Sequence, residues 1–327
     1  MSAAIRVSAK QKGATSGLRP ADSARDMAEI VELIALGFAE ELDPQGQKML
    51  AQMRQMARHR TVSRLAYGSG LDPAGFVWVE DQQVVGNLSL RYALPGYSRG
   101  QMIGNVVVHP DYRGMGISRA LMEAAIESVR FQGARWIGLE VREQNPVACG
   151  LYVRMGFQPV GKQQHLIRPG DVPWMDMSAP ELAWRASKPR DRHLWYALAD
   201  AIYSRRQKWV LEVRPGLFSF GGFERKLNQW LSGEWERAWL NGEEKARLAV
   251  RVKADSRHKF HLLDILMHTH EGEEGARAVV AKALHTMRRF PSWPVATIVA
   301  DYDPLVQMLY DVGFRLHRTL VQMVLEF

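Results

Sequence analysis

The sequence predicts an α+β fold built of two tandem domains. Extended and helical patterns alternate along the first half in the order β-α-α-β-β-β-α-β-α-β. The second half repeats the first at a nearly constant distance. A length of 327 residues also suits two domains.

The expected elements of the first half follow from apolar periodicity and turn residues. After residues 18–22, a helix is expected at 24–38, with Asp22 or Ser23 as its N-cap. The further expected elements are a helix at 45–59, a hairpin of strands 75–80 and 84–92, a loop at 93–100, a strand at 102–108, a helix at 117–131, a strand at 135–141, a helix at 146–155 and a strand at 157–167.

The domain boundaries follow from composition. Residues 1–17 are polar and are expected to form a disordered tail. Three prolines in 168–182 place a linker near 175–183. The expected domains are therefore 18–177 and 178–327.

Matching residues support the repeat. His109 and His268 are 159 positions apart, and six pairs of residues in the helices that follow them have the same separation; apart from Ser128, these residues are apolar. Asn145-Pro146 matches Asp303-Pro304 at a separation of 158 residues, and Gly156-Phe157 matches Gly313-Phe314 at a separation of 157 residues. The steadily shrinking offset indicates a second copy with shorter loops.

Composition predicts a soluble cytoplasmic protein. The chain is 46% hydrophobic and 24% charged, and no apolar run approaches the ~18 residues of a membrane span. Cys149 is the only cysteine, which excludes an internal disulfide. The net charge of +8 is spread over both halves, which favours a solvated basic surface over a nucleic-acid footprint. A ligand with several phosphates would also suit this charge.

The segment 106–118 carries the best functional clue. It reads Val-Val-Val-His-Pro-Asp-Tyr-Arg-Gly-Met-Gly-Ile-Ser, so a strand runs through a turn with two glycines into a helix. Such a turn aims unpaired backbone amides at one point, which suits a phosphate. A plain strand-to-helix turn that binds nothing is equally compatible with these residues alone.

Two motifs at matching spacing resemble the GCN5-related N-acetyltransferases. Arg113-x-x-Gly116-x-Ser118 resembles the acetyl-CoA motif Arg/Gln-x-x-Gly-x-Gly/Ala, with Ser118 as the departure. Asn145, Ala148, Tyr152 and Gly156-Phe157 resemble the family's second signature, Asn-x-x-Ala-x-x-x-Tyr ending in Gly-Phe. The resemblance covers about residues 18–167. It implies two tandem acetyltransferase-like domains, each a mixed, mostly antiparallel twisted sheet flanked by helices.

The resemblance also implies roles for particular residues. Backbone groups of Val106, Val107 and Val108 would pair with the pantetheine arm of acetyl-CoA. Asn145 would hydrogen-bond that arm, and Tyr152 would act as general acid near the sulfur. The pyrophosphate would be held by amides of the turn, namely those of Arg113, Gly114, Met115, Gly116, Ile117 and Ser118. No metal is implied.

Other candidates are less specific. Glu140 is the first candidate for a general base and Glu80 the second, with ion pairing or surface exposure as the alternative. His109 could relay protons but more simply bonds a loop carbonyl. Cys149 is expected to be a packed residue, because no histidine that would activate it is evident.

The second copy is expected to be degenerate. Gly272 replaces Arg113 there, and Glu271, Glu273 and Glu274 crowd the place where a pyrophosphate would lie. Like charges repel, so this copy is not expected to bind CoA in the same way. Tandem members of the family show the same division, and tryptophan-rich segments at 174–195 and 230–239 could line an acceptor cleft or simply pack.

The predicted function is transfer of the acetyl group of acetyl-CoA to a primary amine by direct attack in a ternary complex. The acceptor is a small molecule or a peptide, and 40–60 and 93–100 would shape its site. A non-catalytic acyl-CoA sensor or regulatory module is the alternative. A structural or RNA-associated role would need clustered Lys and Arg with interleaved aromatics, which the sequence lacks.

Overall fold

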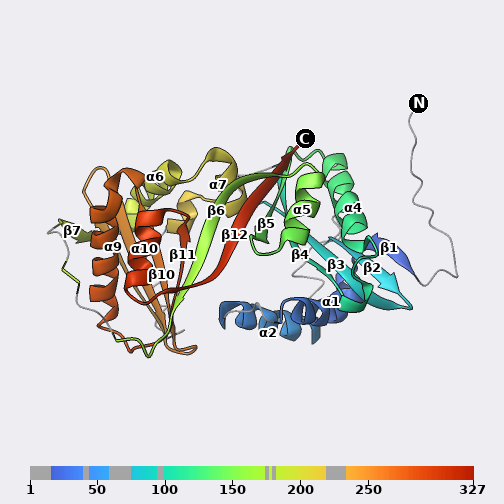
Figure 1. The fold of residues 1–327 in the computed structure, drawn as a ribbon, viewed down its shortest axis with the longest axis horizontal. Coiled ribbons are helices and arrows are strands. Elements are labelled where there is room, and N and C mark those ends of the chain that lie inside the picture. Colours follow the sequence, from blue (N-terminus) through green and yellow to red (C-terminus); the bar gives the residue numbers. More distant parts are fainter. Residues whose placement is uncertain are drawn as a thin grey trace. The chain divides into compact units, whose positions relative to one another are not determined.

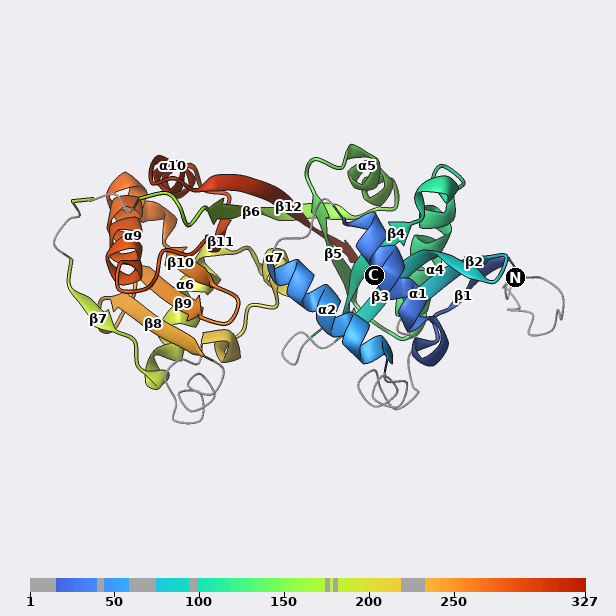
Figure 2. The ribbon, with the colours of Figure 1, turned by 90° about the horizontal axis from the view of Figure 1, so that it is seen from below.

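A computed structural model describes residues 16–39, 44–58, 75–93, 99–173, 177–178, 182–218 and 233–327. They form two compact units, whose ribbons are drawn in Figures 1 and 2. Unit 1 contains the described residues up to 137 together with 326–327. Unit 2 contains the described residues from 138 to 325.

Unit 1 is an antiparallel sheet with helices on both faces. Its strands lie in the order β1-β2-β3-β4. A two-residue turn with positive φ at Asp81 and Gln82 joins the predicted hairpin, as is typical of a tight turn. The elements are β1 (Gly17–Pro20), α1 (Ser23–Gly37), α2 (Pro44–Arg58), β2 (Gly75–Glu80), β3 (Gln83–Tyr92), β4 (Gly100–Val108), a 3-10 turn (Pro110–Tyr112) and α4 (Ile117–Phe131).

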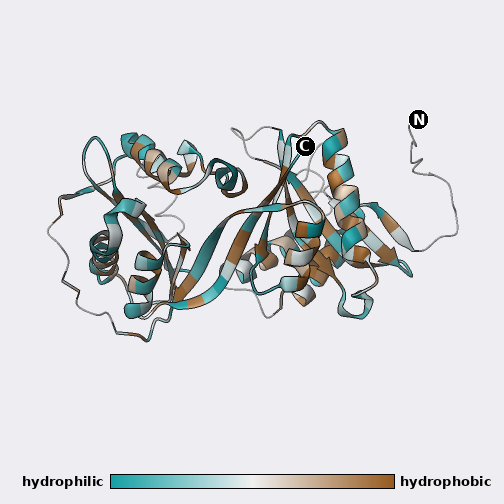
Figure 3. Ribbon diagram, turned by 45° about the horizontal axis from the view of Figure 1, so that its top comes forward, coloured by the Kyte–Doolittle hydropathy of each residue, from teal (hydrophilic) through white to brown (hydrophobic). Residues whose placement is uncertain are grey.

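Alternation along the strands assigns the two faces of this sheet. Val77 is fully buried in the core under α1 and α2. Trp78, the next residue, faces α4, since an added Cβ at Gly86 would meet Trp78, Ile117 and Leu121. In Figure 3 the helices alternate between teal and brown turns, as expected of helices with one buried face.

Unit 2 repeats this plan with its own elements. β5 (Trp136–Arg142) leads the chain from unit 1 into unit 2. The remaining elements are α5 (Pro146–Arg154), β6 (Gln158–Arg168), β7 (Trp184–Ala186), α6 (Arg192–Ile202), α7 (Arg205–Leu211), β8 (Glu234–Asn241), β9 (Leu248–Asp255), β10 (Phe260–Met267), a 3-10 turn (Thr269–Glu271), α9 (Gly272–Met287), β11 (Val295–Ala300), α10 (Asp303–Asp311) and β12 (Arg315–Glu326), with short 3-10 turns at Pro189–Asp191 and Pro215–Phe218.

The two faces of the unit 2 sheet are again separated by alternation. On β9, Leu248 and Val250 belong to the core beneath α9 and α10. Ala249, between them, belongs to the core beneath α6. From β7 to β12 the described elements follow the order of β1 to β6, so the predicted tandem α+β fold is confirmed.

The central strands of unit 2 are exchanged between the two repeat copies. β6 of the first copy lies between β11 and β12 of the second, antiparallel to both. β12 in turn lies between β6 and β5. Gln163 opposes Leu320, its repeat partner at offset 157, so the two long strands are related by an internal pseudo-twofold. Figure 1 shows them side by side.

This exchange explains where the compact units divide. The sequence boundary predicted near 177 separates the repeat copies, whereas the units divide at 137 and 138. β6 belongs to the first copy in sequence but hydrogen-bonds strands of the second copy on both edges. The proposed domains 18–177 and 178–327 are therefore repeat copies joined by strand pairing.

A buried aspartate clamps the first helix in both copies. Asp26, 1% exposed, accepts hydrogen bonds from Arg19 at 2.6 and 2.8 Å. Asp191, 4% exposed, accepts from Arg185 at 2.6 and 3.2 Å. Burial opposes ionisation of Asp26, but hydrogen bonds from Arg19, the Asp22 amide and Arg25 outweigh it and lower its pKa.

We expect Asp26→Asn to lower the free energy of unfolding by about 1–3 kcal/mol at pH 7. A lowered pKa favours the folded state above the unfolded pKa, and this stability is lost as the pH falls through the folded pKa. Below about pH 4 the difference between variant and wild type should therefore shrink. Urea unfolding at several pH values measures this difference in unfolding free energy. Glu123→Gln, which removes an exposed ion pair with Arg119, is the control and should lower the unfolding free energy by less than about 0.5 kcal/mol.

Two expected helices, at 117–131 and 24–38, lie within the described residues. The helix at 117–131 is confirmed with the predicted bounds, and Asp22 caps α1 by accepting from the Arg25 amide at 3.3 Å. Residues 1–15, 40–43 and 59–74, the loop residues 94–98 and parts of the predicted linker lie outside the described chain. Among the helices the structure describes, none has the length and apolarity to cross a membrane.

Candidate functional site

The glycine turn, residues Arg113–Ser118, lies in unit 1 between the 3-10 turn after β4 and the first turn of α4. Gly114 and Gly116 have φ of +79° and +81°, a region that other residues rarely adopt. No atom lies within 4 Å of an added Cβ at either position, so the backbone angle, and not crowding, requires glycine there.

The glycine turn presents free amides at its helical end, whereas the Arg113 amide, also expected to bind the pyrophosphate, already donates to the Pro110 carbonyl at 3.2 Å. Gly116 is the N-cap of α4 and offers no side-chain cap, so the amides of Ile117, Ser118 and Arg119 have no intrahelical acceptor. Met115 is 67% exposed, and the turn opens to solvent. The Arg113 side chain donates to the Val108 carbonyl at 3.2 Å, which ties the turn to the end of β4. The arrangement suits an anionic phosphate.

A β-bulge in β4 precedes the glycine turn. Asn87 opposes Val107 and Ser89 opposes Gly104, so Asn105 and Val106 face one residue of β3. Asn105 has φ +51°, and the buried Asn87 amide donates to its carbonyl at 2.9 Å. Sequence reasoning missed this bulge. The Gly104-Asn105 pair is the only local signal, because both residues tolerate positive φ.

Asn145 is placed at the start of α5 in unit 2. Its side-chain oxygen accepts from the Ala148 amide at 3.0 Å and so caps the helix. Only the NH₂ group of this side chain is left to donate to a ligand. The side chain is exposed, so that group is accessible.

Tyr152 lies on the buried side of α5 and is 6% exposed. Its ring packs against Phe157 at 6.0 Å between centroids. Within the described chain no hydrogen bond to its hydroxyl is recorded. Burial, with a smaller effect of Cys149, raises the pKa of Tyr152 to about 12. A tyrosine is neutral at physiological pH even with its ordinary pKa, and the raised pKa keeps the phenol protonated, and able to donate its proton, at higher pH as well.

The two base candidates differ in their surroundings. Glu140, on β5, is exposed and accepts from the buried Gln322 side chain at 2.8 Å. Gln322 also accepts from Gln207 at 3.2 Å, so its amide is oriented. Hydrogen bonds from Ser16 and Trp78 lower the pKa of Glu80, which makes it a weaker base. Because both carboxylates accept side-chain hydrogen bonds, these contacts do not decide between Glu140 and Glu80.

His109 and Cys149 have structural partners. The His109 ring nitrogen accepts from the Asp111 amide at 3.4 Å and so caps the 3-10 turn. Cys149 contacts the Arg142 carbonyl at 3.4 Å, and burial raises the pKa of its thiol. A raised pKa disfavours the nucleophilic thiolate. Among the described residues no cluster of His, Cys, Asp and Glu could hold a metal ion.

The second copy has a different geometry at the position of the glycine turn. α9 begins at Gly272, directly after the 3-10 turn. Gly272, which matches Arg113, has φ +58°, but residues 273–275, which match 114–116, already lie within the helix. Gly275, which matches Gly116, lies inside this helix, and an added Cβ would come within 2.3 Å of Glu271. The pairing of β9 with β10 continues without a bulge. The sequence predicted repulsion by glutamates, and the structure adds that the turn itself is absent from this described segment.

Tyr310, the match of Tyr152, also differs. Its hydroxyl donates to Gln164 at 3.0 Å. It is therefore engaged in a structural hydrogen bond, whereas no such bond is recorded for Tyr152. The two copies place the same residue type in different chemical surroundings.

Comparisons with known proteins agree on the kind of fold. Residues 41–157 match a family model described as the acetyltransferase (GNAT) family. The ribosomal protein bS18-alanine N-acetyltransferase of Escherichia coli strain K12 is 42% identical over 53 residues, which are 16% of this chain and 36% of that protein. The chain spans about a third of the length of such curated relatives.

Solved structures resemble nearly the whole chain. A GCN5-related N-acetyltransferase from Sphaerobacter thermophilus has a TM-score of 0.64 at 15% identity, covering 95% of this chain and 96% of that one. A tandem GNAT protein from clavulanic acid biosynthesis has a TM-score of 0.54 at 18% identity, covering 95% and 98%. At this identity the likeness concerns the fold.

Proposed function

We propose that this chain, which belongs to the acetyltransferase (GNAT) family, transfers the acetyl group of acetyl-CoA to a primary amine by direct attack in a ternary complex. The observation that carries the proposal is the glycine turn, whose free amides and two glycines at positive φ suit a pyrophosphate. The matching segment of the second copy, residues 272–277, lies in α9 and does not form a turn with two glycines at positive φ. We therefore assign the acetyl-CoA site to the first copy and regard the second copy as degenerate.

In the proposed reaction the neutral amine nitrogen attacks the thioester carbonyl carbon, and the carbon–sulfur bond then breaks. Tyr152 donates its proton to the departing thiolate. Glu140 accepts the proton that the amine loses, directly or through water. Val106 to Val108 and the NH₂ group of Asn145 would bind the pantetheine arm. The acceptor is a small molecule or a peptide amine.

Gly116→Ala should weaken acetyl-CoA binding by at least about tenfold, because an alanine resists positive φ and turns the amides away from the ligand. Gly133→Ala is the matched control, since Gly133 also has positive φ and open space but lies beyond the end of α4. Both changes should cost similar stability, about 1–2 kcal/mol. Isothermal titration with acetyl-CoA and thermal unfolding separate the two effects.

Turnover is tested by following free CoA release with a panel of small and peptide amines. Release with at least one amine supports the proposed reaction. Tight acetyl-CoA binding without release for any amine would instead favour the sensor function. Equal loss of binding in both glycine variants would contradict the assignment of the glycine turn.

A further inference from the structure

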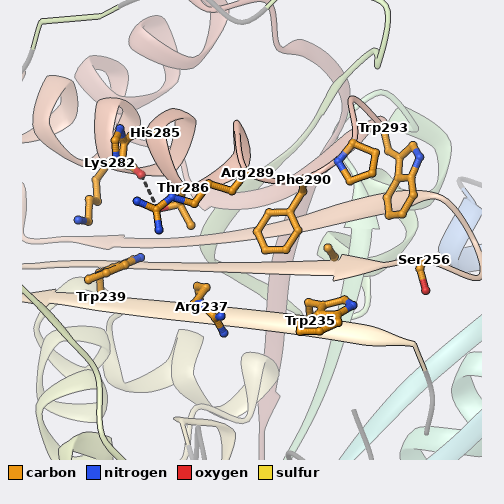
Figure 4. A pocket seen from close by; sticks show the side chains of 12 residues that line it. Trp235, Arg237, Trp239, Ser256, Lys282, His285, Thr286, Arg289, Phe290 and Trp293 are labelled. Carbon is orange, nitrogen blue, oxygen red and sulfur yellow. Dashed lines mark hydrogen bonds between the residues drawn. The ribbon is translucent and has the colours of Figure 1, made fainter. Parts of the chain in front are cut away.

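A cavity of about 520 Å³ lies within unit 2, between β8, β9 and the C-terminal half of α9 (Figure 4). Its size is in the range of ~300–1,000 Å³ typical of small-molecule sites. We call it the tryptophan pocket. Its lining residues are Trp235, Arg237, Trp239, Ala254, Ser256, Lys282, His285, Thr286, Arg289, Phe290, Pro291 and Trp293.

The tryptophan pocket gathers positive charge. Arg237, Lys282 and Arg289 line it, and no aspartate or glutamate does. In the described part of the chain none of the three forms an ion pair. Burial, and the charge of Arg289, lower the pKa of Lys282. Three cations close together without a counter-ion repel one another, and a bound anion would relieve that repulsion.

Aromatic rings supply the flat surfaces of the same pocket. Trp235 and Trp239 project from one face of β8, on either side of Arg237. Phe290 and Trp293 follow the end of α9, and in Figure 4 Phe290 lies near the centre of the view and Trp293 to the right, on the side of Trp235. The Lys282 amine lies 3.7 Å from the Trp239 ring centroid, so charge and aromatic surface adjoin.

We propose that the tryptophan pocket binds a small molecule in which a planar aromatic ring carries a carboxylate or a phosphate. The ring would stack on the tryptophans, and the acidic group would bind Arg289 and Lys282. The pocket shares no residue with the glycine turn or α5, so this ligand is distinct from the acetyl donor. The second copy, with its altered turn, would thus have a binding function of its own.

Isothermal titration of the full chain, without acetyl-CoA, tests this proposal. The probes are indole-3-acetate and AMP, with indole-3-acetamide and adenosine as neutral counterparts and inorganic phosphate as an anion without a ring. At least one aromatic anion should bind at least about tenfold more tightly than its neutral counterpart and than phosphate, since a charge-assisted hydrogen bond contributes that much. The two anions distinguish a carboxylate ligand from a phosphate ligand.

Matched variants locate the binding. Arg289→Glu should weaken it by at least about tenfold, whereas Arg288→Glu, an adjacent exposed arginine outside the lining, should change it by no more than about twofold. Trp235→Ala should also weaken it, and Trp235 is 53% exposed, so the fold tolerates this change. Circular dichroism checks folding of each variant.

Four results would overturn the proposal. They are equal affinity for charged and neutral probes, equal effects of the two arginine variants, displacement of the bound anion by CoA, and no binding of either aromatic anion at millimolar concentration. None of these experiments contains an acetyl donor or an amine acceptor, and CoA is added only in the displacement measurement, so the results are independent of whether the chain transfers acetyl groups.

Discussion

Tyr152→Phe is expected to lower kcat by about 10²- to 10⁴-fold, the usual contribution of a positioned general acid. The substitution removes one oxygen from a residue that is 6% exposed and whose hydroxyl has no recorded partner among the described residues. Little stability should therefore be lost, and the KM for acetyl-CoA should change by no more than about threefold. Steady-state kinetics with the best acceptor measures both constants.

The repeat provides an internal control. Tyr310→Phe makes the same substitution at the matching position, where the hydroxyl donates to Gln164. It should cost about 0.5–1.5 kcal/mol of stability and leave kcat unchanged. If Tyr152→Phe retained wild-type turnover, Tyr152 would have no part in the reaction, and another group or water would have to protonate the thiolate.

The raised pKa of Tyr152 gives this assignment a pH dependence. With a pKa of about 12, the phenol remains protonated as the pH rises through 10, where an ordinary tyrosine loses half its protons. Loss of the general acid should therefore not lower kcat between pH 8 and 10. A fall of kcat near pH 10 in the wild type that is absent from Tyr152→Phe would contradict a raised pKa.

Chain fragments cut at the repeat boundary are expected not to fold independently. In a fragment ending at 177, β6 would lose both of its neighbours, β11 and β12. Its long edges would be unpaired, and Leu166, 1% exposed in the full chain, would face solvent. Unpaired strand edges of this length associate with other chains.

Removing β12 alone should have a comparable effect. Val321, Met323 and Val324 on β12 are at most 7% exposed, and burial of each contributes about 1.5–3 kcal/mol. Their combined loss approaches the net stability of ~5–15 kcal/mol of a typical domain. Size-exclusion chromatography and thermal unfolding should show aggregation or a non-cooperative transition for a chain ending at 313.

Co-expression distinguishes strand exchange from simple instability. Fragments 1–177 and 178–327 produced together should form a soluble complex, because β6 then regains its partners. A fragment 1–177 that is monomeric and melts cooperatively by itself would contradict the structural role of the exchanged strands.

Local elements of this fold were predictable because their signals are local. The apolar spacing at 117, 121 and 125 describes a helix with one buried face, and the structure buries these residues. The positive φ of Gly114 and Gly116 was likewise implied by residue type. The bulge at Asn105 and the early start of α9 were not predictable, since each depends on pairing or packing with residues distant in sequence.

The sequence by itself determined the repeat, the element order and the residue types of the proposed acetyl-CoA site, because periodicity, glycine φ and motif spacing are properties of short segments. Only the tertiary structure decided the partners of β6 and β12, the raised pKa of Tyr152 and the gathering of cations in the tryptophan pocket. Strand neighbours, burial and shared cavities arise between residues far apart in the chain, and no short segment contains that information.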